Sequence, residues 1–448
     1  MFIPHTKEDR EEMLRTIGVE RLEDLFHDVP AEHRFPTLNL PPQLTEMEAI
    51  AELQSLAEAN ETTRDLVSFL GAGAYNHYIP AAVDAILRRG EFFTAYTPYQ
   101  PEISQGTLRA IFDYQSLITA LTGMDVSNAS HYDGATAVAE AVAMANAYFR
   151  GKRGKVILSP ALHPMYRETV RTYNPGDTLT FTGDESFDPA AGPETLLPLI
   201  DLDTALVIVQ YPDFFGRIYD YSALAKAVHE AGALLAVAVN PLSLGLLRPP
   251  GDFGADIVVG EGQPLGIPLS YGGPYLGIFA TRKEYVRKMA GRLVGETVDS
   301  RGQRAYVLTL TAREQHIRRE KATSNICTNQ GLMALASTVY LSLLGKHGLR
   351  QVAELCYHKA HYAASRIASL PGFKVWNHAP FFHEFVVRCP IPAEQVSALL
   401  LDQGILAGYQ LARDYPELEN HLLLAVTEMN TREEIDFLVD SLAEVSDD

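Results

Sequence analysis

Short apolar runs alternate with amphipathic segments between about residues 65 and 280, and this alternation limits the possible folds more than any other feature. The runs are rich in β-branched residues and too short for helices, as expected of buried strands. They lie at residues 155–159, 179–182, 205–211, 234–239, 256–259 and 276–280. Strands that alternate with helices form mostly parallel sheets covered on both faces. The sequence therefore predicts a large, doubly wound α/β domain.

One helix that should cover this sheet is predicted at residues 222–230. Ser222 is expected to cap its N-terminus, and Gly232 to end it. In sheets of this kind, ligands bind at the carboxyl ends of the strands, in the loops that follow them. We therefore expect a functional site to be built from those loops.

Residues 1–64 have the pattern of a helical arm ahead of the main domain. Thr6 with Asp9, and Thr45 with Glu48, have the spacing of capping boxes that start helices. Such an arm either wraps a neighbouring subunit or covers its own domain. The sequence favours neither interpretation.

Residues 65–330 are assigned to the large domain, and residues 331–448 to a small C-terminal α/β domain. The small domain is expected to begin with a helix at residues 331–344. Its strand candidates lie at residues 373–376, 384–388 and 422–427. A closing helix has apolar residues at a spacing of three and four, which is typical of one buried face. These residues are Ile435, Leu438, Val439 and Leu442.

The composition excludes several classes of function. A net charge of −19 argues against nucleic acid and acidic membranes as partners, because both need clustered Lys and Arg. The longest apolar helix candidate, residues 332–344, is shorter than the roughly 20 residues of a membrane span. The N-terminus has no apolar signal core, and the 3 cysteines are too scattered for a disulfide framework or a Cys-type zinc site. We therefore expect a cytoplasmic protein with no metal centre.

The strand–loop–strand at residues 255–281 is built like the loops that present a reactive group over a cofactor in many α/β enzymes. Its loop offers Glu261, Gln263, Ser270 and Tyr271, but no lysine, histidine or cysteine. Any functional interpretation has to explain why a loop of this type lacks its lysine.

The segment TPYQPEISQG at residues 97–106, with the tyrosine before it, is the most unusual in the chain. Its site candidates are Tyr96, Tyr99, Gln100, Glu102 and Ser104. So many polar side chains in a loop braced by prolines are costly to bury without partners. We therefore favour a functional loop over a surface loop whose side chains bond only locally.

A second candidate segment, residues 319–331, lies at the predicted domain junction. Its Thr323, Ser324 and Asn325 are small polar residues that can line a narrow cleft. Lys321 precedes a turn and does not end a strand. Cys327 has no histidine at a telling spacing, so a buried structural cysteine is expected.

Asp133 and His163 are interpreted as structural residues. Asp133 is placed to cap the helix that begins at DGATAVAEA, where its carboxylate would satisfy the helix dipole and repel a phosphate. His163 follows a predicted strand, and a lone histidine in such a place is more often structural than catalytic.

Four motifs, TPYQPEISQG, DGATAVAEA, SYGGPYLGIFA and REKATSNICT, together resemble the glycine cleavage system P-protein family over essentially the whole chain. The resemblance is greatest to the N-terminal half of that enzyme, which in some bacteria is a separate subunit 1, or α. It implies the aspartate-aminotransferase-like fold, which is fold type I of pyridoxal-phosphate enzymes. It also implies the oxidoreductase activity of glycine dehydrogenase (decarboxylating).

The same resemblance accounts for the missing lysine. The other half of the family carries pyridoxal phosphate on a lysine whose place here falls at about Pro264. An aspartate that would pair with the pyridine nitrogen is also absent, because only apolar residues precede Asn240 in the neighbouring strand. We therefore expect no cofactor-binding residues in this chain. Pyridoxal phosphate is expected on a partner, subunit 2 or β.

In the family's reaction, glycine loses CO₂ with the coenzyme as electron sink, and the aminomethyl group passes to the lipoyl group of H-protein. Because sites of this fold lie at a subunit interface, we expect this chain to supply a second wall of the partner's site. We call these residues the predicted wall: Tyr96, Tyr99, Gln100, Glu102 and Ser104, with Thr323, Ser324 and Asn325 as weaker members. The family implies an α2β2 heterotetramer.

Two other hypotheses fit the sequence. The second hypothesis is a catalytically inert scaffold that stabilises the partner subunit or docks H-protein. The third hypothesis is a free-standing pyridoxal-phosphate enzyme that uses an unusual lysine such as Lys321.

Overall fold

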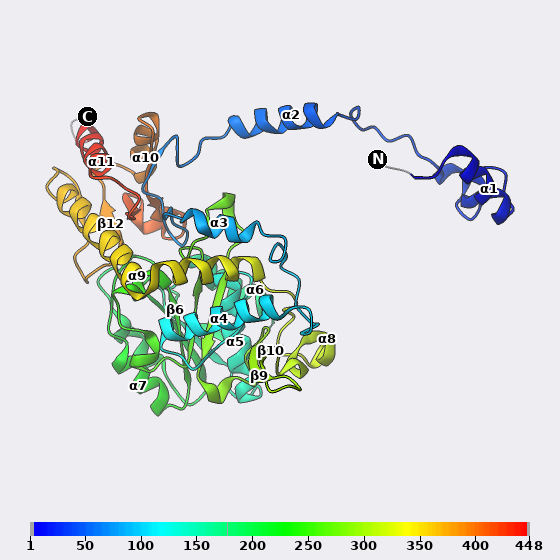
Figure 1. Cartoon of the computed structure of the whole chain (residues 1–448). Coiled ribbons are helices and arrows are strands. Elements are labelled where there is room, and N and C mark those ends of the chain that lie inside the picture. Colours follow the sequence, from blue (N-terminus) through cyan, green and yellow to red (C-terminus); the bar gives the residue numbers. More distant parts are fainter. Residues whose placement is uncertain (1–3, 177, 446–448) are drawn as a thin grey trace. The chain divides into compact units, whose positions relative to one another are not determined.

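The computed structural model describes residues 4–176 and 178–445 (Figure 1). Contacts divide the chain into two compact units, Met1–Glu61 and Thr62–Asp448. The helices are α1 Lys7–Ile17, α2 Glu46–Glu58, α3 Ala81–Leu87, α4 Gln105–Thr122, α5 Gly134–Phe149, α6 Pro164–Tyr173, α7 Ser222–Glu230, α8 Gln315–Arg318, α9 Gly331–Ile367, α10 Ala393–Asp402 and α11 Arg432–Val445. The strands are β1 Val67–Ser68, β2 Val126–Ser127, β3 Lys155–Leu158, β4 Thr180–Thr182, β5 Thr204–Tyr211, β6 Leu234–Val239, β7 Ile257–Glu261, β8 Gly277–Thr281, β9 Val294–Val298, β10 Arg304–Leu308, β11 Lys374–Val375, β12 Glu384–Arg388, β13 Ile405–Leu406, β14 Tyr409–Gln410 and β15 His421–Ala425.

The first unit holds α1 and α2, and both helices begin at the predicted capping boxes. The Thr6 hydroxyl accepts from the Asp9 N–H at 3.2 Å, and the Thr45 hydroxyl accepts from the Glu48 N–H at 3.4 Å. Neither helix buries a residue. The apolar side chains of α2 are therefore largely exposed, with Ile50 at 57% and Leu53 at 66%. Whether the arm wraps a neighbouring subunit stays a prediction.

A seven-stranded sheet forms the centre of the second unit, in the order β2-β8-β7-β6-β5-β3-β4. The strands β4, β3, β5, β6 and β7 are parallel, and β8 and β2 close one edge antiparallel. The six predicted strands are present, with ends shifted by one or two residues. The helix at residues 222–230 is also present, but Ser222 does not cap it. Its hydroxyl instead donates to Asp220 Oδ1 at 2.6 Å, and the helix has no side-chain cap.

Helices cover both faces of this sheet. Alternate residues of a strand therefore pack into two different hydrophobic cores, one on each face. Val207 and Val209 of β5 pack with residues of α4, α7 and α9. Leu206 and Ile208 of the same strand pack with residues of α5 and α6. Figure 1 shows α4 and α9 crossing one face of the sheet. The doubly wound architecture leaves the loops at the carboxyl ends of β5, β6 and β7 free to build a site.

A second sheet, in the order β11-β12-β15-β14, lies toward the C-terminus with α10 and α11. α11 buries Ile435, Leu438, Val439 and Leu442, as predicted. The leading helix α9 continues beyond the predicted residue 344, across a break at Gly345 where φ is 56°. Phe69, next to β1, belongs to the same core, and β1 pairs with β13. The proposed boundary at residues 330/331 therefore stays a prediction.

No helix in the described ranges is long and apolar enough to cross a bilayer.

Candidate functional site

The loop before α4 is anchored at one end and exposed along the rest. Gln105 donates from Nε2 to Pro101 O at 2.7 Å and to Tyr306 O at 2.9 Å, and its Oε1 accepts from the Tyr306 N–H at 2.9 Å. These bonds fix the loop to β10. Tyr96 is 72% exposed and Tyr99 is 44% exposed. The loop therefore presents aromatic side chains outward from a rigid base, which is a geometry suited to contact with another molecule.

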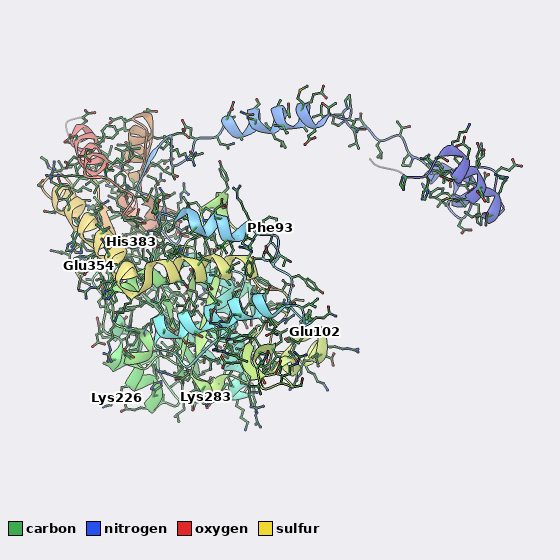
Figure 2. All side chains as sticks on the ribbon, in the orientation of Figure 1. Phe93, Glu102, Lys226, Lys283, Glu354 and His383 are labelled. Atoms are coloured by element: carbon green, nitrogen blue, oxygen red, sulfur yellow. The ribbon has the colours of Figure 1, made fainter. Side chains whose placement is uncertain are left out.

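The remaining members of this part of the predicted wall lie beside the tyrosines. Gln100 and Glu102 are exposed, and Ser104 is half-buried at the start of α4. Figure 2 labels Glu102 at this end of the molecule. The Thr97 hydroxyl is buried and has no hydrogen-bond partner in the described structure.

A buried arginine holds Tyr99 from behind. Arg292 is 2% exposed and donates from Nη2 to the Tyr99 hydroxyl at 2.8 Å. Its Nη1 lies 2.7 Å from Glu314 Oε2, which in turn lies 3.4 Å from His316 Nδ1. The His316 ring stands edge-on to Tyr99, with centroids 6.2 Å apart. None of these three charged or titratable residues was predicted from the sequence, although Glu314 and His316 stand directly before the candidate segment at residues 319–331.

Two members of the second part of the predicted wall line a hollow. Thr323 and Ser324 line it together with Arg292 and Glu314, whereas Asn325 does not. Tyr96 lines a separate hollow with Asn329. The structure thus brings two of the three weaker candidates to the residues that hold Tyr99, and leaves Asn325 exposed.

Ser324 also contacts a buried carboxyl group. Its hydroxyl donates to Glu140 Oε1 at 2.5 Å, while Glu140 Oε2 is buried without a partner. Burial raises the pKa of Glu140 to about 7, although the bond from Ser324 lowers it somewhat. This carboxyl group therefore prefers its protonated form in the folded protein.

The raised pKa of Glu140 predicts a pH dependence of folding stability. A carboxyl group whose pKa is higher in the folded than in the unfolded state stabilises the fold fully below the unfolded pKa of about 4.5, and this contribution is lost as the pH rises through about 7. We expect the thermal midpoint of the Glu140→Gln variant to fall less than that of the parent protein between pH 5 and pH 8. Equal slopes for the two proteins would contradict this assignment.

The cleft at the carboxyl end of this chain's own sheet does not fit a coenzyme. The N-terminus of α5, where a phosphate would bind, already carries two carboxylates. The Gly134 N–H donates to Glu261 Oε2 at 2.9 Å, and the Thr136 N–H donates to Asp133 Oδ1 at 2.7 Å. Glu261 Oε1 accepts two further backbone N–H groups at 3.0 Å. Asp133 is therefore the structural cap that the sequence predicts. Glu261 adds a second carboxyl group that the sequence did not reveal, and burial raises its pKa to about 7.

The other contacts of a coenzyme are missing from the same cleft. The buried Pro264 stands where a lysine is expected. The Asn240 side chain is hydrogen-bonded at 2.9 Å to Nε2 of His383, the residue labelled in Figure 2. The Gln263 amide closes the space by bonding to both the N–H and the carbonyl of Tyr75, at 2.8 and 2.9 Å. The cleft is thus filled by the chain's own groups.

A lysine at position 264 is therefore not expected to create a coenzyme site. Glu261 already occupies the α5 N-terminus, because its carboxyl group accepts the Gly134 N–H that a phosphate would need. We expect the Pro264→Lys variant, mixed with pyridoxal phosphate and then dialysed, to show no coenzyme absorption band, like the parent protein. Stoichiometric retention of the coenzyme by Pro264→Lys would show that Glu261 does not block the site.

Two further residues from the sequence analysis have clear outcomes. His163 is structural, because its Nε2 lies 2.8 Å from Ala72 O and its Nδ1 accepts from the Met165 N–H at 3.2 Å. The expectation of a buried Cys327 is wrong. Its side chain is exposed, since residues 319–328 run along the surface and only Ile326 is buried.

Within the described ranges, one group combines the side-chain types of a metal site. His77, Cys356 and Glu428 place their ligand atoms within 4.8 Å of one another. These atoms are already hydrogen-bonded together, since Glu428 Oε2 lies 2.7 Å from His77 Nδ1 and 3.2 Å from Cys356 Sγ. Burial opposes the charged form of Glu428, but the bonds from His77 and Tyr78 prevail and lower its pKa to about 2. The hydrogen bonds account for this cluster, and the expectation of no metal centre stays a prediction.

Comparison with known proteins identifies the family. The profile of the glycine cleavage system P-protein matches residues 1–442. The chain belongs to the glycine cleavage system P-protein family. A probable glycine dehydrogenase (decarboxylating) subunit 1 of Thermomicrobium roseum is 55% identical over 453 residues, covering 100% of both chains. The family resemblance drawn from the four motifs is thereby confirmed.

Solved structures give the same result for the P-protein fold. The crystal structure of a glycine decarboxylase (P-protein) of the glycine cleavage system, in inhibitor-bound form, matches with a TM-score of 0.91 and 43% identity, covering 99% of this chain and 100% of that one. The sphingosine-1-phosphate lyase of Burkholderia pseudomallei matches with a TM-score of 0.67 at 15% identity, covering 93% and 94%, which shows the fold alone. The predicted class, fold type I of pyridoxal-phosphate enzymes, is confirmed.

Proposed function

We propose that this chain is the coenzyme-free subunit of a glycine-decarboxylating P-protein, and that it completes an active site whose pyridoxal phosphate is held by a partner subunit. With that partner it decarboxylates glycine and transfers the aminomethyl group to the lipoyl group of H-protein. The observation that carries the proposal is a contrast between two places. The chain's own cleft is closed by Glu261, Gln263 and Pro264, whereas the exposed Tyr99 is held by the buried Arg292.

The geometry of the predicted wall supports a direct role in the site. Tyr99 receives a hydrogen bond from a buried guanidinium, so its hydroxyl oxygen is fixed and its proton is free to point outward. Such a group can donate to a carboxylate or a phosphate oxygen. We assign Tyr99 to orienting an anionic group of glycine or of the coenzyme in the partner's site. We assign Tyr96 and Glu102 to shaping the channel for the lipoyl arm.

The family names support a second subunit. Relatives that match the whole chain are named subunit 1. We propose an α2β2 heterotetramer, which the molar mass of the purified complex would test. We also place the protein in the cytoplasm, where its three cysteines, all free, would stay reduced.

The test is a set of substitutions in the reconstituted complex. We expect Tyr99→Phe to lower glycine–bicarbonate exchange by roughly 10- to 100-fold, because a positioned hydrogen bond to the reacting group is lost. Tyr96→Phe and Glu102→Gln are expected to have smaller effects. The matched controls are Tyr148→Phe, a tyrosine of similar exposure packed on Phe149 and Tyr285, and Glu354→Gln. Both controls should retain full exchange.

The same variants distinguish the scaffold hypothesis. A purely structural subunit would lose assembly before it loses turnover, so co-purification with the coenzyme-bearing subunit is measured for every variant. Full exchange activity in Tyr96→Phe, Tyr99→Phe and Glu102→Gln complexes would reject the proposed wall.

A further inference from the structure

Positive charge is concentrated in one part of this acidic chain. Residues 282–321 carry eleven Lys and Arg residues against five Asp and Glu residues, although the whole chain has a net charge of −19. This stretch contains Arg292, Glu314 and His316, which hold Tyr99. The positive segment is therefore part of the same surface as the predicted wall.

Most of this charge is not neutralised locally. In the described part of the chain, the ion pairs of Lys and Arg residues in this stretch join Arg292 to Glu314 at 2.7 Å and Arg304 to Glu296 at 3.9 Å. The other nine cations form no ion pair there, and five of them we call the basic rim: Arg287, Lys288, Arg318, Arg319 and Lys321. All are exposed except Lys288, which is half-buried.

The basic rim borders the candidate site on two sides. Arg287 and Lys288 line the hollow that also contains Thr323 and Ser324. Arg318 ends α8, which carries His316 against Tyr99, and Arg319 and Lys321 follow it toward Thr323. Figure 1 shows α8 next to β9 and β10 at this end of the molecule. Unpaired cations therefore line the hollow that contains Thr323 and Ser324, and they also flank the helix that contacts Tyr99.

The arrangement favours a macromolecular surface over a small anion. A small-anion site needs donors that converge at one point, often at a helix N-terminus or with buried partners. The rim cations are exposed and distributed over two chain segments. Unpaired exposed charges of one sign, spread beside a site, attract a surface of the opposite charge and raise its rate of encounter.

We propose that the basic rim docks an acidic surface of the lipoyl-bearing H-protein, so that the lipoyl arm enters beside the predicted wall. This inference depends on the proposed function, which requires that a carrier protein present its lipoyl group to the site. In the rest of the chain Asp and Glu outnumber Lys and Arg, and this negative charge would disfavour docking of an acidic protein there. The rim is thus the complementary face.

The test uses the complex reconstituted with the coenzyme-bearing subunit. The variants are Arg318→Ala/Arg319→Ala and, independently, Arg287→Ala/Lys288→Ala. The control Lys226→Ala/Lys346→Ala removes the same charge from α7 and α9, away from the rim (Figure 2 labels Lys226). Two quantities are measured: the KM for lipoylated H-protein at low and high ionic strength, and the change in coenzyme absorbance on adding glycine without H-protein.

We expect each rim variant to raise the KM for H-protein about tenfold at low ionic strength, with kcat nearly unchanged and the difference reduced at high salt. The glycine-induced absorbance change should equal that of the control. A KM equal to that of the control in both rim variants would overturn the docking proposal. Loss of assembly in the rim variants would also overturn it, because the rim would then belong to the interface between subunits.

A failure of the proposed function would look different. The parent mixture would then show no change in coenzyme absorbance with glycine, whatever the state of the basic rim. A normal glycine response combined with a KM that does not depend on salt would leave the proposed function intact and reject only the docking surface.

Discussion

Replacing Gly216 by alanine is expected to destabilise the protein by about 3–5 kcal/mol, because a left-handed backbone and a steric collision act together. Gly216 has a φ of +82°, and a Cβ there would lie 2.0 Å from the backbone oxygen of Glu384 and 2.6 Å from its carbonyl carbon. The loop after β5 packs against β12 of the second sheet at this point, where Arg217 and Phe381 form a β-bridge. Since the obstacle is backbone, rotation of a side chain cannot relieve it.

The single tryptophan of the chain gives a direct measurement. The ring centroids of Trp376 and Phe215, the neighbour of Gly216, lie 5.6 Å apart. Trp376 fluorescence during urea unfolding therefore reports on the contact between the loop after β5 and the second sheet. Gly302→Ala is the matched control, because Gly302 has a φ of +75° with no atom within 4 Å of the added Cβ. We expect the control to lose only about 1–2 kcal/mol from the left-handed backbone. Similar losses in the two variants would show that the contact between the sheets yields easily.

Replacing Arg292 by methionine is expected to cost a similar amount, about 3–5 kcal/mol, because the buried Glu314 carboxylate would lose its guanidinium partner. Both side chains are nearly inaccessible, at 2% and 4% exposed. The double variant Arg292→Met/Glu314→Gln removes both charges and should recover most of the stability. A double variant no more stable than Arg292→Met would mean that packing, and not the charge pair, makes this arginine important.

The same cycle separates stability from function. Arg292 donates to the Tyr99 hydroxyl, so both the single and the double variant lose the bond that fixes this phenol. We therefore expect glycine–bicarbonate exchange in the reconstituted complex to stay at least roughly tenfold low in the double variant, although its stability recovers. Recovery of exchange together with stability would show that Tyr99 needs no support from Arg292.

The two pairs of variants test two different contacts in the second unit. The variants at Gly216 test how the two sheets of the second unit are held together. The variants at Arg292 test how a loop on the surface is held in one geometry from beneath. Both effects depend on groups far apart in the sequence, since Arg292 and Tyr99 are joined across 193 positions.

Much of the fold was predictable because its determinants are local. The apolar runs marked β3 to β8 to within two residues, and the spacing of Ile435, Leu438 and Val439 marked the buried face of α11. Ser222 shows where local rules fail: it is the first residue of the helix and not its cap, and its hydroxyl donates to Asp220. Cys327 shows a second limit, since sequence spacing does not reveal which side of a surface segment faces inward.

The sequence alone determined the class of fold, the family and the lack of a lysine at position 264, because periodicity, motif order and the identity of one residue are properties of the chain itself. Only the tertiary structure decided that Glu261 sits on the N-terminus of α5, that Arg292 holds Tyr99, and that five cations near them stay unpaired. Each of these depends on a distance between residues remote in the sequence. Hydrogen bonds and ion pairs form within a few ångströms, so no local pattern encodes them until the sheet has brought its loops together.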